Sequence, residues 1–205
     1  MKLVFATNNQ HKTDEVRSAI ETATSLQIIT LREAGIDVDI PEPYATLEEN
    51  ASNKSRTIYA LIKTKGLVAG CFGEDTGLEV EALNGQPGVK SARYAGEEKS
   101  FEKNINKLLH ALEGTSNRRA RFRAVISLII DDKEQLFEGV CPGTIVDHRQ
   151  GEAGFGYDPV FVPDGAIHTF AEMDMTEKNR FSHRKKAVDK LVTYLSEQVL
   201  ALKAP

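Results

Sequence analysis

Hydrophobic residues recur along this chain with a helical period in four stretches, and each stretch predicts a helix with one apolar face. The apolar positions are Val16, Ala19, Ile20 and Ala23 in the first stretch; Leu47, Ala51, Ile58, Leu61 and Ile62 in the second; Phe101, Ile105, Leu108, Leu109 and Leu112 in the third; and Val188, Leu191, Val192, Leu195, Val199 and Leu202 in the fourth. Gly66 and Gly114 follow two of these helices as stop signals, and Ser100 and Ser182 precede two as N-caps.

Short apolar runs and alternating runs predict the strands. The alternating run Arg119–Asp131, a turn at residues 131–134 and the run Gln135–Val140 predict an antiparallel hairpin. Shorter strands are expected at residues 3–6, 26–30, 144–147 and 159–162. Because helices and strands are intermixed, the pattern predicts an α/β fold with a mixed central sheet, bent into two lobes around a cleft, and flanking helices. The chain has 205 residues and no repeat or linker-like stretch, so one domain over residues 1–205 is expected.

The acidic stretch Gly73–Leu78 interrupts an otherwise apolar region. The run Leu67–Phe72 before it predicts a buried strand, and the alternation over residues 78–82 after it predicts a second strand. Glu74 and Asp75 would then occupy a turn at a strand terminus, where two adjacent carboxylates are costly to bury without a cationic partner. The sequence favours a charged site there, and an ordinary acidic turn is the alternative.

A polar segment between the first strand and the first helix could bind phosphate. Thr7, Asn8 and Asn9 supply neutral hydrogen-bonding groups and Lys12 supplies a charge, next to the backbone N–H groups at a helix start. The glycines of a Walker A loop are missing. An asparagine-rich helix cap is therefore the simpler interpretation of this segment.

Two further residues are placed by their neighbours in the chain. Glu42 lies between Pro41 and Pro43, which fix the backbone around its carboxylate. Lys54 lies one helical turn after Asn50 and could point into a cleft, although a solvated helix face is the alternative.

The C-terminal third carries aromatic and cationic candidates. Phe155 and Tyr157, separated by a glycine and followed by Asp158, could form a wall for a planar base or equally a tight turn with both rings packed inward. Arg184 falls in the first turn of the last helix, where a cation costs about 0.3–1 kcal/mol unless an anion joins it. Such a local exception to helix rules is typical of functional sites.

Bulk composition excludes several classes of protein. With 40% hydrophobic and 27% charged residues, the chain is neither disordered nor fibrous. A net charge of -4 without a long Lys/Arg run argues against nucleic-acid binding but allows a small anionic substrate. No apolar run approaches the roughly 20 residues of a membrane span, and no signal peptide is evident, so a cytoplasmic protein is expected. The cysteines Cys71 and Cys141 form no zinc-type motif.

Six motifs in one order resemble those of the inosine triphosphate pyrophosphatase family, the Ham1-like non-canonical purine nucleoside triphosphate pyrophosphatases. The motifs are Ala6–Asn9 with Lys12 and Glu15; Glu49–Ala51 with Lys54; Glu74–Leu78; Gly85–Gly88 with Ser91–Tyr94; Gly154–Pro159; and Ser182–Arg184 with Lys186 and Ala187. The resemblance extends from about Lys2 to Leu195. It implies hydrolysis of ITP, XTP and their deoxy forms to a monophosphate and pyrophosphate in a substrate cleft, with Mg²⁺, by a homodimer.

The resemblance also implies roles for individual residues. The metal ligands implied are Glu42 and Asp75, with Asp75 also the proton acceptor. The substrate contacts implied are Thr7, Asn8, Asn9, Gln10, His11, Lys12 and Lys54 for the triphosphate, Thr76 beside the substrate, and Phe155, Gly156, Tyr157, Asp158, Lys178, His183 and Arg184 for the base or sugar. The chain departs from many relatives by having Asn8 and His11 at positions where glycines are common, and Glu74–Thr76 in place of Asp-Asp-Ser.

Two points of mechanism stay open at this stage. Metal coordination and proton acceptance are competing tasks for Asp75, so Glu74 is an alternative for activating water. Donors from Arg184, His183 or nearby backbone N–H groups would favour a 6-oxo purine over adenine by roughly 1–3 kcal/mol per mismatched donor. Two other functions are also possible: a Maf-like pyrophosphatase acting on pyrimidine or modified nucleotides, and a nucleotide-binding module without catalysis.

Overall fold

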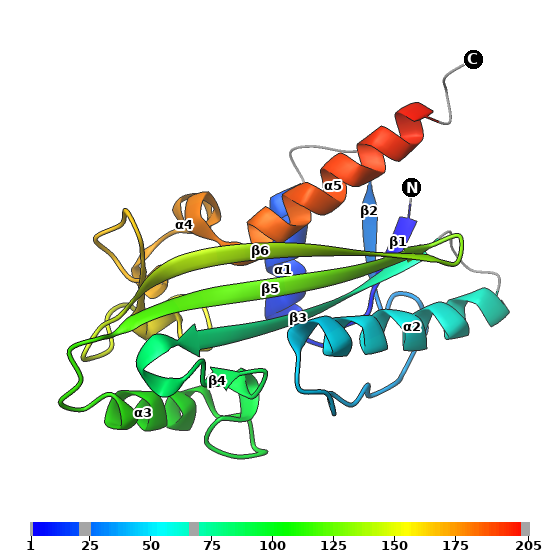
Figure 1. Ribbon diagram of the computed structural model, residues 1–205. Helices are drawn as coiled ribbons and strands as arrows, with labels where there is room; N and C mark the ends of the chain where they lie inside the picture. The colour runs from blue at the N-terminus through cyan, green and yellow to red at the C-terminus, as the bar shows by residue number, and fades with distance from the viewer. Residues whose placement is uncertain (1, 21–25, 66–69, 202–205) are drawn as a thin grey trace. The chain divides into compact units, whose positions relative to one another are not determined.

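The computed structural model describes residues 2–20, 26–65 and 70–201 (Figure 1). The predictions for Ala23, for residues 66–69 and for Leu202 lie outside the described residues, as do those for the side chains of Ile20 and Val199. Among the described helices, none combines the length and apolarity that crossing a membrane requires.

Five α-helices and a mixed sheet make up the described chain, which confirms the predicted α/β class. The strands are β1 (Lys2–Phe5), β2 (Gln27–Thr30), β3 (Gly70–Val80), β4 (Pro87–Gly88), β5 (Arg119–Ile130), β6 (Lys133–Ile145) and β7 (Phe161–Pro163). Their order is β2-β1-β3-β5-β6-β7, with β4 paired to β3. β1 is parallel to β2 and β3, whereas β4 on β3 and β7 on β6 are antiparallel. The helices are α1 (Gln10–Ile20), α2 (Leu47–Lys65), α3 (Phe101–Ala111), α4 (Met175–Phe181) and α5 (His183–Ala201).

The chain divides into two compact units. The first unit comprises Met1–Asp75, Ala124–Gly139 and Arg184–Pro205, and the second comprises Thr76–Arg123 and Val140–His183. Strands β3, β5 and β6 contribute residues to both units. That the two units form a single domain with a cleft remains a prediction.

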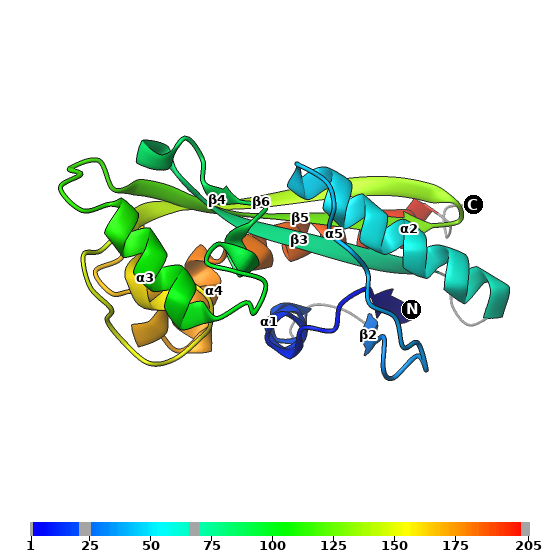
Figure 2. The same ribbon diagram turned by 90° about the horizontal axis from the view of Figure 1, so that it is seen from below.

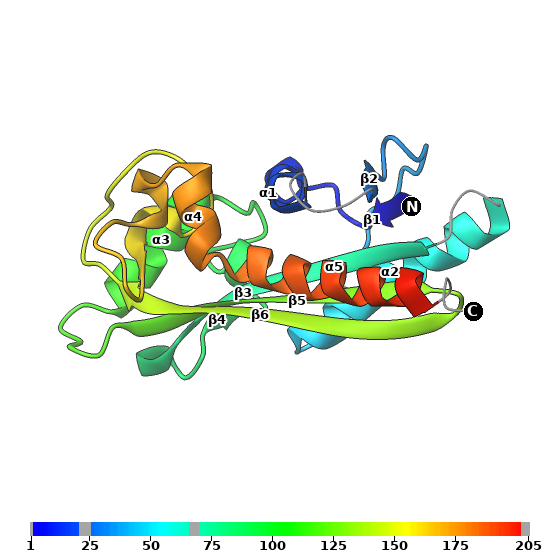
Figure 3. The same cartoon turned by 90° about the horizontal axis from the view of Figure 1, so that it is seen from above.

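In the first unit, alternation along the strands sends apolar side chains to both faces of the sheet. Leu3 and Phe5 of β1 belong to one core cluster together with residues of α1 and α5, and the Phe5 and Phe72 rings stack at 4.4 Å. Val4 belongs to a second cluster with Ile58 and Ile62 of α2. Figures 2 and 3, which view the molecule from opposite sides, accordingly show α2 and α5 on opposite faces of the strands.

The second unit has a core of its own beneath α3. Ile105, Leu108 and Leu112 pack with Leu78 of β3 and Phe161 of β7. The side chain of Ser100 accepts a hydrogen bond from the Lys103 N–H as the predicted N-cap, and Gly114 adopts φ 68° just after the helix. Phe101 is exposed, so its predicted place on the buried face is wrong. Its ring lies near Phe155 instead, with centroids 6.1 Å apart.

The predicted turn at Gly73–Leu78 is wrong, because β3 runs without a break from Gly70 to Val80. Its glycines are needed for close backbone contacts rather than for a turn. A Cβ on Gly73 would lie 2.5 Å from the carbonyl oxygen of Ala51 on α2, and a Cβ on Gly77 would lie 2.6 Å from the carbonyl oxygen of Gly88 on β4. The acidic pair therefore lies within a strand and not at its terminus.

The strand β6 is also longer than predicted, and one helix was missed. The prediction has one strand ending at Val140 and another at residues 144–147, but β6 continues through Pro142 and Gly143 to Ile145 and pairs there with β7. The strand predicted at residues 159–162 begins only at Phe161, because Asp158–Val160 forms a 3₁₀ helix. The observed strand is β7 (Phe161–Pro163). The seven-residue α4, capped by the Asp174 side chain, was too short and too polar to show a helical period.

Candidate functional site

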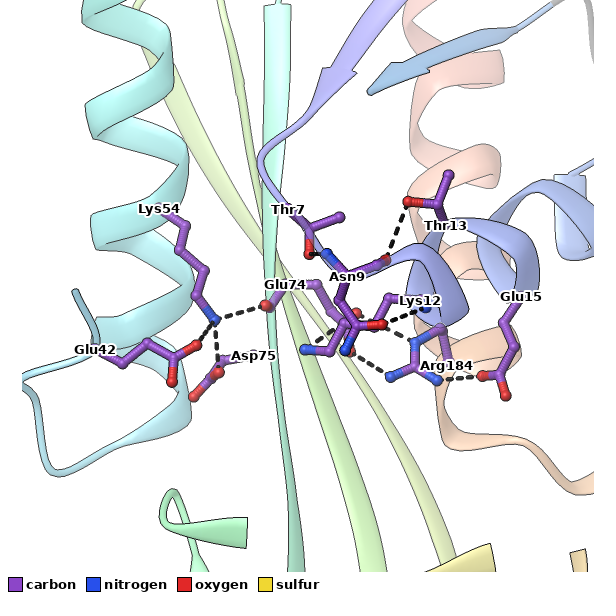
Figure 4. A network of polar contacts seen from close by, with 10 residues as sticks. All are labelled: Thr7, Asn9, Lys12, Thr13, Glu15, Glu42, Lys54, Glu74, Asp75 and Arg184. Atoms are coloured by element: carbon purple, nitrogen blue, oxygen red, sulfur yellow. Dashed lines mark hydrogen bonds and ion pairs between the residues drawn. The ribbon is translucent and has the colours of Figure 1, made fainter. Parts of the chain in front are cut away.

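Lys54 lies at the centre of a cluster of acidic groups in the first unit (Figure 4). Its Nζ atom is 2.7 Å from Oδ1 of Asp75, 2.6 Å from Oε1 of Glu42 and 3.0 Å from the backbone carbonyl oxygen of Glu74. Lys54 and Asp75 are buried, and the Glu42 side chain is 26% exposed. We call Lys54, Glu42 and Asp75 the Lys54 cluster.

Local structure brings the three members of the Lys54 cluster together. Gly73 allows α2 to lie directly on β3, so that Lys54 stands beside Asp75. The Asn50 side chain accepts a hydrogen bond from the Tyr44 N–H and donates one to the Tyr44 carbonyl oxygen, which fastens the loop that carries Glu42 to the start of α2. The Asn53 side chain donates to the Pro41 carbonyl oxygen at the other end of that loop.

Burial and opposite charge act against each other within the cluster. Burial raises the pKa of Asp75 above its ordinary value, and the positive charges of Lys54 and Lys12 reduce this rise without cancelling it. Burial alone would lower the pKa of Lys54, but the carboxylates of Asp75 and Glu42 hold it above the ordinary value. Lys54 therefore stays protonated across the physiological range.

Glu74 points away from Asp75, because neighbouring residues of a strand face opposite sides of the sheet (Figure 4). The guanidinium of Arg184 donates to both carboxylate oxygens of Glu74, at 3.2 and 3.1 Å, and also to the Glu15 carboxylate on α1. All three side chains are buried. A cation in the first turn of α5 is expected to need an anionic partner, and the carboxylates of Glu74 and Glu15 are these partners. Both carboxylates raise the pKa of Arg184.

The segment from Thr7 to Lys12 forms a helix cap and brings one cation to the acidic pair. The Asn9 side chain accepts a hydrogen bond from the Lys12 N–H at the start of α1, and the Thr7 hydroxyl accepts one from the Asn9 N–H. The Lys12 Nζ lies 3.7 Å from the Glu74 carboxylate, while burial lowers the pKa of Lys12. The remaining residues of the segment, Asn8, Gln10 and His11, are exposed.

In the aromatic segment Phe155–Asp158 of the second unit, one ring is packed inward, as in a tight turn, and the other is half-buried, as a wall for a base would be. Tyr157 is buried, and its hydroxyl donates to the Ser91 carbonyl oxygen. Phe155 is half-buried, and Lys178 lies 5.4 Å from its ring centroid. Asp158 holds this arrangement, because one carboxylate oxygen accepts from the Phe155 N–H at 2.8 Å and from Lys178 Nζ at 2.7 Å.

The other candidates of the second unit are His183 and Thr76. His183 is buried, and its ring stacks on Phe122 with centroids 4.8 Å apart and planes 10° apart. Thr76 follows Asp75 in β3 and is half-buried. Gly156 adopts φ 64°, which a residue with a side chain rarely adopts, so it shapes the turn after Phe155.

Sequence reasoning placed Glu15 and Asn50 in motifs but assigned neither of them a role in the site. The Glu15 side chain is buried on α1 together with Thr13 and Val16, and a buried carboxylate needs a cationic partner. The sequence favours a solvated helix face for Asn50, whereas its side chain is buried and fixes the Glu42 loop.

The arrangement of acidic groups fits a divalent ion only in part. Within the described residues, no group of three or more His, Cys, Asp and Glu side chains is placed to hold a metal ion. Glu42 and Asp75 nevertheless converge on a single cationic group, Lys54 Nζ. Mg²⁺ is commonly held by one or two carboxylates when phosphates and water complete its octahedron. The two carboxylates therefore fit a magnesium ion that arrives with a phosphate-bearing ligand.

The fold and these ion pairs define a class of protein: a mixed-sheet α/β protein in which Lys12 and Lys54 contact the acidic residues of β3. The chain belongs to the Ham1 family, whose model matches residues 3–194.

Relatives and solved structures agree with this membership over nearly the whole chain. A dITP/XTP pyrophosphatase of Flavobacterium johnsoniae is 45% identical, with 96% of this chain and 98% of the relative covered. A dITP/XTP pyrophosphatase of Porphyromonas gingivalis is 48% identical, with 95% and 97% covered. The structure of the Staphylococcus aureus Ham1 protein is 40% identical, with a TM-score of 0.83 over 97% of this chain and all of that one. A HAM1 protein from Coxiella burnetii is 36% identical, with a TM-score of 0.84 and 96% and 99% covered.

Proposed function

We propose that this protein hydrolyses non-canonical purine nucleoside triphosphates, dITP, ITP and XTP, to the monophosphate and pyrophosphate, and so removes them from the nucleotide pool. The observation that carries the proposal is the Lys54 cluster, in which two carboxylates converge on one buried site with a lysine among them. Full-length relatives named dITP/XTP pyrophosphatase support the substrate class.

The proposed reaction requires neutralisation of phosphate charge. Lys12 and Lys54 lie within contact distance of the acidic pair on β3, so both are candidates for triphosphate binding. Glu42 and Asp75 would hold Mg²⁺, which when bound polarises phosphate oxygens and neutralises charge on them. The backbone N–H groups at the start of α1, with Thr7, Asn8, Asn9, Gln10 and His11 nearby, add neutral donors.

The geometry favours Asp75 over Glu74 as the group that accepts the proton of the attacking water. Glu74 is fully buried, and both of its carboxylate oxygens accept from Arg184. Such a carboxylate is stabilised in its charged form and is a weak base. Burial raises the pKa of Asp75 in the metal-free protein and a bound Mg²⁺ would lower it again, so the choice between the two residues rests on the pairing of Glu74 with Arg184. We therefore assign Asp75 to proton acceptance and Glu74 to fixing Arg184 and Lys12.

Base recognition is assigned to the second unit and the start of α5. Phe155 offers a half-buried ring whose position is fixed by Asp158 and Lys178. Gly156 and Tyr157 shape that turn, and Thr76 lies next to the catalytic aspartate in the chain. Donors from His183, Arg184 or backbone N–H groups would face the 6-oxo group of hypoxanthine or xanthine. Adenine presents a donor at that position, and each donor–donor mismatch costs roughly 1–3 kcal/mol.

The test is the initial rate of pyrophosphate release from dITP, ITP, XTP, GTP, ATP, dUTP, UTP and CTP, each with and without Mg²⁺. We expect Mg²⁺-dependent release from the first three and a rate for ATP lower by at least about tenfold, one donor mismatch. Equal rates for ITP and ATP would contradict the base-recognition account. Preferred hydrolysis of pyrimidine nucleotides would indicate a Maf-like enzyme, and nucleotide binding without any release would indicate a binding module.

We also propose that the protein acts in the cytoplasm as a homodimer and binds neither nucleic acid nor membranes. The net charge of -4 supports the absence of nucleic-acid binding. Sedimentation equilibrium of the purified protein tests the dimer, because a mass near the 22.6 kDa of one chain would contradict it.

A further inference from the structure

We propose that Lys54 is an internal counter-cation that occupies the place of the divalent ion in the nucleotide-free protein and moves to the substrate phosphates when the ion binds. The inference rests on the proposed function for the identity of the substrate. It adds that metal binding and nucleotide binding are coupled through the displacement of one lysine.

The hydrogen bonds of Lys54 carry the first step. An ammonium group has three donors and no acceptor. The Lys54 ammonium has an acceptor at hydrogen-bond distance for each of them, namely Oδ1 of Asp75, Oε1 of Glu42 and the Glu74 carbonyl oxygen. Lys54 therefore has to release at least one of these oxygens before it can donate to a phosphate.

The charges of the cluster carry the second step. Asp75 is buried, and bringing Glu42 next to it without a cation would place two carboxylates together in a poorly solvated site. Lys54 supplies the positive charge that makes this arrangement stable. A divalent ion bound by the same two carboxylates would replace that charge and repel the ammonium from them.

The number of ligands carries the third step. The described residues offer two converging carboxylates here and no third metal-ligating side chain. Mg²⁺ demands a nearly octahedral set of oxygens and is usually completed by substrate phosphates and water. The ion is therefore expected to bind firmly only with the nucleotide, whose phosphates also offer the displaced ammonium new acceptors.

The carboxylates are better fixed than the lysine, so the exchange needs little rearrangement. Asp75 lies in the middle of β3, and Asn50 and Asn53 fasten both ends of the Glu42 loop to α2. Lys54 has a flexible four-carbon side chain that can redirect its ammonium group by changing rotamers.

The test is the affinity of the nucleotide-free protein for Mn²⁺, measured by electron paramagnetic resonance. Lys54→Met removes the competing charge but keeps an unbranched side chain. We expect its Mn²⁺ affinity to exceed that of the unchanged protein by about tenfold or more, because a buried cation next to the ligands is gone. Lys63→Met is the matched control, since Lys63 lies on the same helix and pairs with Asp132 on the exposed surface. Its Mn²⁺ affinity should not change, and an unchanged or lower affinity of Lys54→Met would overturn the proposal.

A second measurement uses the unchanged protein and does not depend on the folding of a variant. The side-chain ¹⁵N–¹H signal of Lys54 can be followed by nuclear magnetic resonance, with Lys54→Arg used for assignment. We expect the signal to shift strongly when Mg²⁺ and a non-hydrolysable xanthosine triphosphate analogue are added together and little with Mg²⁺ alone. A signal that stays in place with both ligands bound would overturn the exchange. Neither experiment measures turnover, so failure of the proposed activity would be seen separately, as a lack of pyrophosphate release.

Discussion

At the scale of single residues, two adjacent acidic residues have different roles because β3 directs their side chains to opposite faces of the sheet. Asp75 faces Lys54, whereas Glu74 faces Arg184 and Lys12. Sequence reasoning identified both residues and the need for cationic partners, but it could not divide the roles. The division depends on whether the chain turns or continues as a strand at Gly73, and glycine is compatible with both.

Replacing Asp75 with asparagine tests the assigned base. Asp75→Asn should lower kcat by at least about a hundredfold, because the amide cannot accept the proton from water. The variant should fold, since asparagine is nearly isosteric with aspartate. Circular dichroism and pyrophosphate release on the same sample measure both effects, and turnover within a few-fold of the unchanged enzyme would exclude this role for Asp75.

Glu74→Gln tests the structural role of the other carboxylate. Arg184 would remain buried next to Glu15 but would lose the charge of Glu74, so we expect the free energy of unfolding to fall by about 3–5 kcal/mol. Urea denaturation measures this change. Glu33→Gln is the control, because the Arg17–Glu33 ion pair is exposed and should contribute no more than about 1 kcal/mol. Equal effects of the two substitutions would contradict the burial argument.

The thiol of Cys71 gives a prediction about alkaline stability. Burial raises the pKa of Cys71 from 9.0 to about 12, and the thiol lies 3.1 Å from the Ser55 carbonyl oxygen, to which it donates. Because the folded state holds this proton more tightly, the stabilisation is complete below pH 9 and is lost as the pH rises toward 12. Unfolding free energy should therefore fall by about 1.4 kcal/mol per pH unit above pH 9 from this group. Cys71→Ser should remove this contribution to the decline of the unfolding free energy above pH 9. Equal slopes of unfolding free energy against pH for the two proteins would contradict the prediction.

At the scale of elements, periodic patterns predicted those helices and strands whose burial is simple. The helices α2 and α3 have one apolar face each, and α3 begins directly after its predicted N-cap, Ser100. The pattern did not predict the full length of β3 and β6. Glycines lie inside β3 because neighbouring backbones approach closely, and Pro142 and Gly143 lie inside β6 where it meets the short strand β7. The pattern also missed α4, whose seven residues are held mainly by a cap and by the buried Lys178.

Gly73→Ala tests the close packing of α2 on β3. The added Cβ would lie 2.5 Å from the Ala51 carbonyl oxygen and 2.8 Å from the Ser55 backbone nitrogen, so α2 has to move. We expect a loss of about 1–3 kcal/mol in unfolding free energy and a lower kcat, because Lys54 moves with the helix. Ala60→Ser, on the exposed side of α2, is the control. If Gly73→Ala kept both stability and kcat, helix packing would not position Lys54.

At the scale of the whole molecule, residues far apart in the chain supply each part of the candidate site. In the first unit, Glu15, Glu74 and Arg184 come from α1, β3 and α5 yet share one network of hydrogen bonds. In the second unit, Ser91, Tyr157 and Asp158 fix the turn that carries Phe155. Motif order indicated the family because each motif supplies one of these pieces. The contacts of Glu15 and Asn50 depend on tertiary structure and could not be derived from motif order.

The position of bond cleavage tests the central claim most directly. Hydrolysis of XTP in water enriched in ¹⁸O, followed by mass spectrometry of the products, shows which phosphorus atom the water attacks. Attack at the α-phosphorus predicts one ¹⁸O atom in the xanthosine monophosphate and none in the pyrophosphate. Label in the pyrophosphate, or release of orthophosphate with a nucleoside diphosphate, would contradict the proposed reaction.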